Sequence, residues 1–278
     1  MFIIGNRLLL WTFSLAFVVA PPPSAPVWPN QWHASFTVEQ CGTTWLSQSK
    51  NTGSFHYDVD INNLTHHGRS LEHHGKGQHN NWCGCASKTN EDCKILFYVY
   101  DPLYDRSSTK PPAATYVVLS KTEKDGTKSP SLCCKLFQGI GKGPLSPTWI
   151  ANGNAPYAGT KYAGYPKREC EKWSNPHPGN SKFMKEDLWM IDADGVPCGY
   201  VDVFKWWAKA LGFSHSFTFN ATTYSNTTAG PSTLFDLPTE SLDCNQPCPN
   251  RNDKLKPWCP STYSWNDAIL DGIKALQN

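Results

Sequence analysis

Histidines and cysteines that could bind metal or act in catalysis are concentrated between positions 66 and 85. Five histidines fall within fourteen residues, and the tripeptide HHG occurs twice. Imidazole suits zinc and copper, but a structural zinc site needs defined ligand spacing on a rigid frame. The neighbours here are Asn, Gly, Gln and Lys without periodicity, so we expect a solvated polar loop that gains charge at acid pH. The weak metal candidates are His66, His67, His73, His74 and His79.

A cysteine hydrolase is the main enzymatic alternative. Cys83 or Cys85, followed by His215 and Asn220, gives the order Cys, His, Asn of papain-like proteases, but the local signature of that family is absent. The chain has no G-x-S-x-G motif of a serine hydrolase. The acidic run that begins at Asp192 does not match an EF-hand loop and predicts a hairpin turn instead. We therefore expect no catalytic residues and no cofactor.

The first twenty residues predict a secretory signal peptide. Arg7 supplies the positive charge, and the apolar run 8–19 is too short to span a bilayer comfortably. An uncleaved anchor is the alternative, because each small-residue cleavage site is followed by Pro. The mature chain is expected to be secreted or lumenal, with the extracellular space, a lysosome or a vacuole as its destination. A net charge of +2 without a basic tract gives no case for nucleic acid.

Eleven cysteines in a secreted chain predict disulfides. The odd number leaves one cysteine free or bridged to a second copy, which would give a homodimer. Cys133 and Cys134 are adjacent in a predicted strand, so their side chains point to opposite faces and we expect two different, distant partners. The disulfide candidates are Cys83, Cys85, Cys93, Cys133, Cys134, Cys170, Cys198, Cys244 and Cys248.

Three N-x-[ST] sequons predict N-glycosylation in the same compartment. They begin at Asn63, Asn220 and Asn226.

Strand signals outnumber helix signals. Alternating or continuous apolar runs separated by Gly and Pro turns predict a mainly β fold of cupped antiparallel sheets, either a half-barrel or a sandwich. The predicted strands cover 32–40, 54–61, 93–100, 114–121, 131–137, 213–221 and a hairpin at 188–198. Helical patterns occur at 203–211 and, more strongly, at 264–278. Disorder is expected at 21–29 and in the polar loop 60–92.

Aromatic residues on two of these strands could line an apolar pocket for a lipid or another hydrophobic ligand. An ordinary filled core fits the same periodicity equally well. The pocket candidates are Trp32, Phe36, Phe213, Phe217 and Phe219.

The order of several short motifs resembles that of ependymin-like secreted proteins, in particular their plant and protist relatives. These motifs are Tyr57-Asp58, the pair Cys133-Cys134, Leu145 to Trp149, Tyr157 to Gly159, Cys170 to Trp173, and Phe235 to Pro238 before Cys244 and Cys248. The resemblance covers roughly residues 28–249. It implies a cupped β fold like that of bacterial lipoprotein carriers, an apolar pocket between sheets and no catalytic residues.

This chain departs from the family in three places, namely Cys41, the long histidine loop and the tail after Cys248. The expected organisation is a signal peptide at 1–20, a β domain at 26–249, and a Pro- and Cys-rich connector with a terminal helix at 250–278. The expected function is non-catalytic binding of a hydrophobic ligand. A glycosylated extracellular interaction or matrix protein with a filled core is the first alternative, and a secreted cysteine hydrolase is the second.

Overall fold

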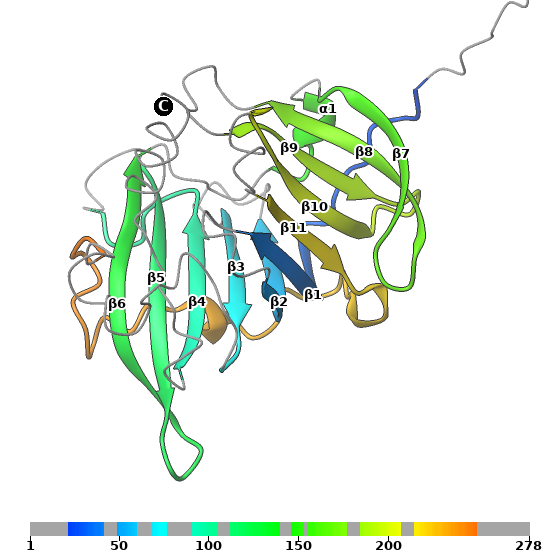
Figure 1. The fold of residues 1–278 in the computed structure, drawn as a ribbon. Helices are drawn as coiled ribbons and strands as arrows, with labels where there is room; N and C mark the ends of the chain where they lie inside the picture. Colours follow the sequence, from blue (N-terminus) through cyan, green and yellow to red (C-terminus); the bar gives the residue numbers. More distant parts are fainter. Residues whose placement is uncertain are drawn as a thin grey trace, which may run out of the picture.

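A single curved antiparallel sheet forms the protein (Figure 1). The computed structural model describes residues 22–41, 49–59, 68–76, 91–104, 112–139, 146–152, 155–176, 184–206 and 214–248. Eleven strands pair within them in the order β6-β5-β4-β3-β2-β1-β11-β10-β9-β8-β7. The predicted mainly β, antiparallel fold is confirmed, as one open sheet.

Each predicted strand overlaps an observed one, whereas β3, β7 and β8 were not predicted. The observed strands are β1 (Gln31–Cys41), β2 (Ser49–Val59), β3 (Gly68–His74), β4 (Glu91–Tyr98), β5 (Ala113–Thr122), β6 (Lys128–Gly139), β7 (Tyr157–Ala163), β8 (Arg168–Pro176), β9 (Met184–Ile191), β10 (Pro197–Phe204) and β11 (Ser214–Phe219). Three short helical turns accompany them, α1 (Trp149–Asn152), η2 (Ala221–Thr223) and η3 (Ser232–Phe235).

The first and last strands meet in the middle of the sheet. The chain runs strand by strand from β1 outward to β6, crosses to β7 at the other edge, and returns to β11. β11 then pairs with β1, so that Phe36 faces Phe219 and Val38 faces Phe217. Residues far apart in the sequence are thereby brought onto one surface.

Both faces of the sheet carry buried apolar clusters. We call the side that carries Trp32 and Phe36 the aromatic face, and the other side the opposite face. Cross-strand register places Ile95 of β4 on the aromatic face, whereas its neighbour Leu96 lies on the opposite face, and both are buried. β4 is therefore covered on both sides, as the continuous apolar run of this strand requires.

The segment 22–30 covers part of the aromatic face. Trp28 is 3% exposed and contacts Trp32 and Trp149 edge-to-face. The backbone N–H of Trp28 donates to the carbonyl of Pro147, and the N–H of Val59 donates to the carbonyl of Asn30. The expectation of disorder at 21–29 is wrong for the described residues, because burial of the indole fixes this Pro-rich segment.

The segment 229–248 covers part of the opposite face. Phe235 of η3 is 2% exposed and packs in one cluster with Leu96 and Tyr116. The hydroxyl of Tyr98 donates to the Phe235 carbonyl, and the Arg69 guanidinium lies 4.4 Å from the centre of the Phe235 ring.

Two disulfides hold the end of this segment on either side of β6. Cys133 is bonded to Cys244 on the opposite face, and Cys134 is bonded to Cys248 on the aromatic face. The prediction of two different, distant partners is confirmed. Between these bonds the chain passes around the edge of the sheet. There the N–H of Lys135 donates to the carbonyl of Gln246, and the N–H of Cys248 donates to the carbonyl of Lys135.

The other described disulfide candidates are also bonded. Cys170 of β8 is joined to Cys198 of β10, and Cys93 is disulfide-bonded as well. Cys83 and Cys85 lie outside the described residues.

The helix prediction at 203–211 is wrong at its start. Val203 and Phe204 continue β10 and pair with β9, because cross-strand hydrogen bonding overrides the helical propensity of this stretch. The predicted terminal helix and the connector at 250–278 lie outside the described residues.

The hairpin turn expected at Asp192 is confirmed. The Asp192 carboxylate accepts from the N–H groups of Asp194 and Val196, and Gly195 has a φ of 80°.

We expect the two neighbouring disulfides to be partly redundant. Once one disulfide has closed its loop of more than a hundred residues, the second disulfide closes an additional ring of only a few residues. Loop entropy then predicts a loss of about 2 kcal/mol when either pair alone is changed to Ala, and about 7 kcal/mol when both are changed. Urea unfolding followed by tryptophan fluorescence measures these losses. If the free-energy losses of the two single-pair variants added up to the loss in the double variant, the two disulfides would act independently and their redundancy would be excluded.

Candidate functional site

Four of the five predicted pocket residues form one cluster on the aromatic face. Trp32 and Phe36 come from β1, and Phe217 and Phe219 come from β11, the strand beside it. All four are at most 4% exposed. The rings of Phe36 and Phe217 lie 4.8 Å apart, and those of Trp32 and Phe219 lie 5.9 Å apart. Phe213 lies outside the described residues.

The centre of this cluster is a residue that the sequence did not single out. The ring of Trp28 makes edge-to-face contacts with Trp32, Tyr57, Trp149 and Trp189. Core residues are recognised in a sequence by the periodic spacing of apolar residues. The Pro-rich segment around Trp28 has no such period, so Trp28 could not be found in this way.

Buried indole N–H groups are a polar feature of the cluster. The Nε1 atoms of Trp28, Trp32, Trp149 and Trp173 have no hydrogen-bond partner among the described residues, and three of these indoles, those of Trp32, Trp149 and Trp28, meet at the Trp28 ring. A buried donor without an acceptor costs about 1–3 kcal/mol. The edge-to-face ring contacts offer weaker N–H···π partners. An apolar surface with three unpaired donors is suited to an apolar ligand that carries an acceptor.

A group of titratable side chains borders the aromatic cluster. His215 Nδ1 donates to Asp202 at 2.7 Å, and the hydroxyl of Tyr200 donates to the same carboxylate. Asp187 lies opposite Asp202 on β9, and both carboxylates are buried. Burial, and then the nearby Asp202 and Asp187 carboxylates, hold the pKa of Tyr200 well above its ordinary value. Tyr200 therefore keeps its proton near neutral pH and acts as a donor.

Two of the residues expected for a cysteine hydrolase, His215 and Asn220, are described by the structure, and they do not lie together. His215 contacts Phe217 on the aromatic face, whereas Asn220 follows the last residue of β11 and lies on the opposite face. The two side chains are thus separated by the sheet. Cys83 and Cys85 lie outside the described residues.

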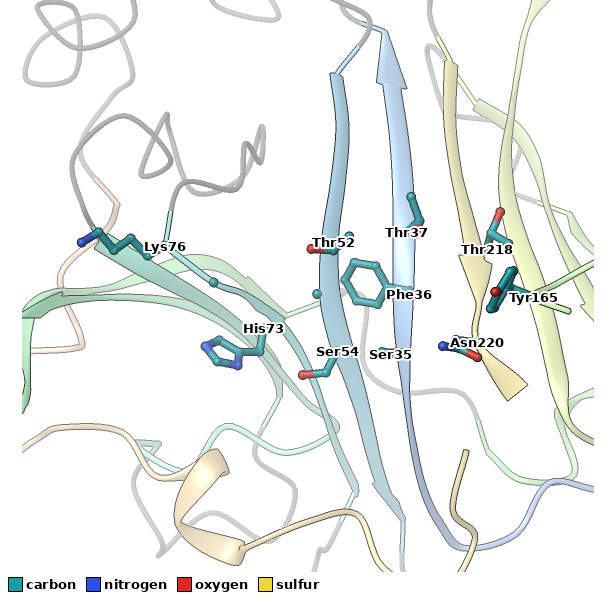
Figure 2. Close-up of a pocket in the computed structure, with 12 residues that line it drawn as sticks. Ser35, Phe36, Thr37, Thr52, Ser54, His73, Lys76, Tyr165, Thr218 and Asn220 are labelled. Atoms are coloured by element: carbon teal, nitrogen blue, oxygen red, sulfur yellow. The ribbon is translucent and has the colours of Figure 1, made fainter. Parts of the chain in front are cut away.

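The opposite face carries a groove of about 630 Å³ over the centre of the sheet (Figure 2). We call it the hydroxyl groove, because its floor presents hydroxyl side chains of β2, β1 and β11. His73 and Lys76 line one side, and Tyr165 and Asn220 line the other. The floor residues are Ser35, Thr37, Thr52, Ser54 and Thr218.

The expectation of a solvated histidine loop is wrong for two of its five members. His73 and His74 belong to β3, which pairs with β2 and β4. His74 is fully buried and its ring lies 5.4 Å from that of Phe36. Burial lowers the pKa of His73 to about 4, against a smaller opposite effect of Asp92. His73 therefore stays neutral at pH 5, where most of the five histidines were expected to gain charge.

The remaining metal candidates His66, His67 and His79 lie outside the described residues. Within the described ranges, no group of three His, Cys, Asp or Glu side chains is placed to hold a metal ion.

The sequons differ in their surroundings. Asn226 is exposed, whereas Asn220 is half-buried and lines the hydroxyl groove. Asn63 lies outside the described residues.

In the described part of the chain, no helix has both the length and the apolar character needed to cross a membrane.

Comparisons with known proteins identify no family. No family model and no curated protein matches the chain. Among solved structures, a DUF1329 family protein from Desulfovibrio piger aligns over 75% of this chain and 90% of its own, with 9% identity and a TM-score of 0.32. A likeness of this size supports no inference about function, and the resemblance to ependymin-like proteins stays a prediction. Fold and site define a disulfide-stapled, mainly β protein.

We expect His73 to make the protein less stable in acid. Its pKa of about 4 in the fold is below the ordinary 6.5, so the unfolded chain takes up the proton first as the pH falls. Stability is complete above about pH 6.5 and is lost as the pH falls toward 4, by about 2 kcal/mol between pH 7 and pH 5. Urea unfolding at both pH values should show this loss in the wild type and not in His73→Asn. An equal loss in both proteins would exclude His73 as its source.

Proposed function

We propose that this protein is a secreted, non-catalytic binding protein for a hydrophobic ligand that carries a hydrogen-bond acceptor. The ligand contacts the aromatic face of the sheet, beneath the segment 22–30. A fatty acid, with an apolar chain and a carboxylate, has the required chemistry. The disulfides fit an oxidising compartment, and they support the secreted part of the proposal.

The observation that carries the proposal is the group of three buried indole N–H donors without acceptors. Trp28 contacts both Trp32 and Trp149, so the three donors belong to one place on the aromatic face. A carboxylate or carbonyl oxygen there would satisfy donors that are otherwise left unpaired in an apolar surface.

Displacement of the segment 22–30 is energetically accessible to such a ligand. Even full transfer of the Trp28 side chain into water would cost only roughly 3 kcal/mol, and this is an upper limit because the segment can shift outward while the indole stays in contact with the ligand. Burial of an acyl chain returns about 0.8 kcal/mol for each CH₂ group, so a long chain offsets this cost several times over. Few described backbone hydrogen bonds tie the segment down; those of Trp28 and Asn30 are two of them.

A second candidate function is supported by the packing of the same cluster. The chain's own Trp28 and Trp149 already bury the aromatic face, as expected of a filled core. In this case the protein works through its glycans and surface as an extracellular interaction protein, and the indole donors point at neighbouring rings.

Probe binding distinguishes the two candidates. Delipidated protein is titrated with cis-parinaric acid, which carries a carboxylate, and with diphenylhexatriene, which has no acceptor, and the fluorescence of each probe is followed. We expect both probes to bind the wild type. The double variant Trp32→Phe, Trp149→Phe keeps the aromatic surface and removes two donors, so its affinity for cis-parinaric acid should fall roughly tenfold while that for diphenylhexatriene stays the same.

Trp206→Phe is the matched control, because Trp206 is 80% exposed and lies outside the cluster. Lipid mass spectrometry of natively extracted protein gives an independent measure of the bound ligand. Failure of both probes to bind, together with an extract free of lipid, would reject the binding function and favour the filled core. Equal loss of both probes in the double variant would reject the role of the indole donors.

A further inference from the structure

We propose that the hydroxyl groove receives the chain's own N-linked glycan, attached to Asn220. The ligand class is therefore an N-acetylglucosamine-based oligosaccharide, held against the opposite face of the sheet. This inference rests on the secretory route of the proposed function, but it concerns the face that the hydrophobic ligand does not use, so it can fail while ligand binding holds, and the reverse.

The side chain of Asn220 is oriented for this attachment. Its Oδ1 accepts from the backbone N–H of Thr222 at 3.0 Å and from the Thr222 hydroxyl at 2.8 Å. Thr222 is the hydroxyl residue of the sequon, so both groups of the sequon are held together. The amide nitrogen Nδ2 makes no hydrogen bond to any described residue, and Figure 2 shows it on the side of the amide that faces β1 and the groove.

The bond that forms is an N-glycosidic bond. The Nδ2 atom loses a proton and bonds to C1 of the first N-acetylglucosamine, while the bond from C1 to a lipid-linked diphosphate breaks and the diphosphate leaves with the electron pair. The donor is the lipid-diphosphate oligosaccharide of the secretory pathway. Transfer to the unfolded chain precedes folding, so the half-buried position of Asn220 is no obstacle.

The groove has the size and chemistry that a sugar requires. Its volume of about 630 Å³ falls within the range of small-ligand sites. Hydroxyls of Ser35, Thr37 and Thr218 line its floor beside Asn220 and can exchange hydrogen bonds with sugar hydroxyls. Tyr165 stands next to Asn220, and the residue is 64% exposed at the side of the groove. The apolar side of a sugar ring would cover it.

Asn226 provides a matched control within the same chain. Its sequon lies six residues further on, but the side chain is exposed and does not line the groove. A glycan at Asn226 extends into solvent, whereas a glycan at Asn220 is held along the sheet.

Native deglycosylation of the full chain, secreted from eukaryotic cells, tests the inference. Glycopeptide mass spectrometry should find Asn220 occupied, and peptide N-glycosidase acting on the native protein should release its glycan about tenfold more slowly than that of Asn226. After denaturation the two rates should become equal. Tyr165→Ala should bring the native rate at Asn220 close to that at Asn226, without changing occupancy.

Two further variants test whether the glycan at Asn220 contacts the fold or merely occupies its sequon. Asn220→Gln should lower the melting temperature of the secreted protein, and Asn226→Gln should leave it unchanged. An unoccupied Asn220, or native release at equal rates from the two sites, would overturn the inference.

Discussion

Burial of a sheet that carries apolar clusters on both faces is the constraint on which this structure depends. An eleven-stranded open sheet has two surfaces to protect, and α1 is a single turn long. In the part of the chain that the structure describes, this protection comes from irregular chain. The segment 22–30 lies on the aromatic face, and the segment 229–248 lies on the opposite face. Irregular chain has few hydrogen bonds of its own, so it must be held by side chains and disulfides.

Different interactions hold the two covering segments. Along 229–248, the adjacent disulfides at β6 hold one end, and two histidines hold the other. His33 donates through Nδ1 to the carbonyl of Thr228, and His56 donates through Nδ1 to the carbonyl of Ala229. The segment 22–30 depends instead on the indole of Trp28. The aromatic face is thus covered by the more weakly attached segment, and this difference makes it the face where a ligand can compete with the chain.

Elements with a clear alternation of apolar residues could be predicted from the sequence, and this includes most of the strands. Strand geometry predicted that Cys133 and Cys134 bond to two different, distant cysteines, but it could not say which ones. β3 could not be found in this way, because Gly68–His74 contains a single large apolar residue and is a strand only through its pairing with β2 and β4. Tertiary pairing here overrides local composition.

The contents of the candidate site were only partly accessible to sequence reasoning. Phe217 and Phe219 were found by periodicity, but their partner Trp28 lies in a Pro-rich segment without any period. Asp187, Asp202 and His215 are separated by turns and come together only through the register of β9, β10 and β11. No local pattern records such a register.

The two edges of the sheet are treated differently by the chain. At β6 the edge is occupied by residues 246–248, which take up backbone groups of Lys135. At the other end of the sheet β7 pairs with β8 alone among the described residues, and its own residues are mostly exposed. A strand with an unpaired side offers its backbone to another chain, whereas backbone groups that are already paired do not. Around Lys135 the chain thus protects β6 from such pairing with its own residues, and β7 is left with the charged and exposed side chains of its surface as its protection.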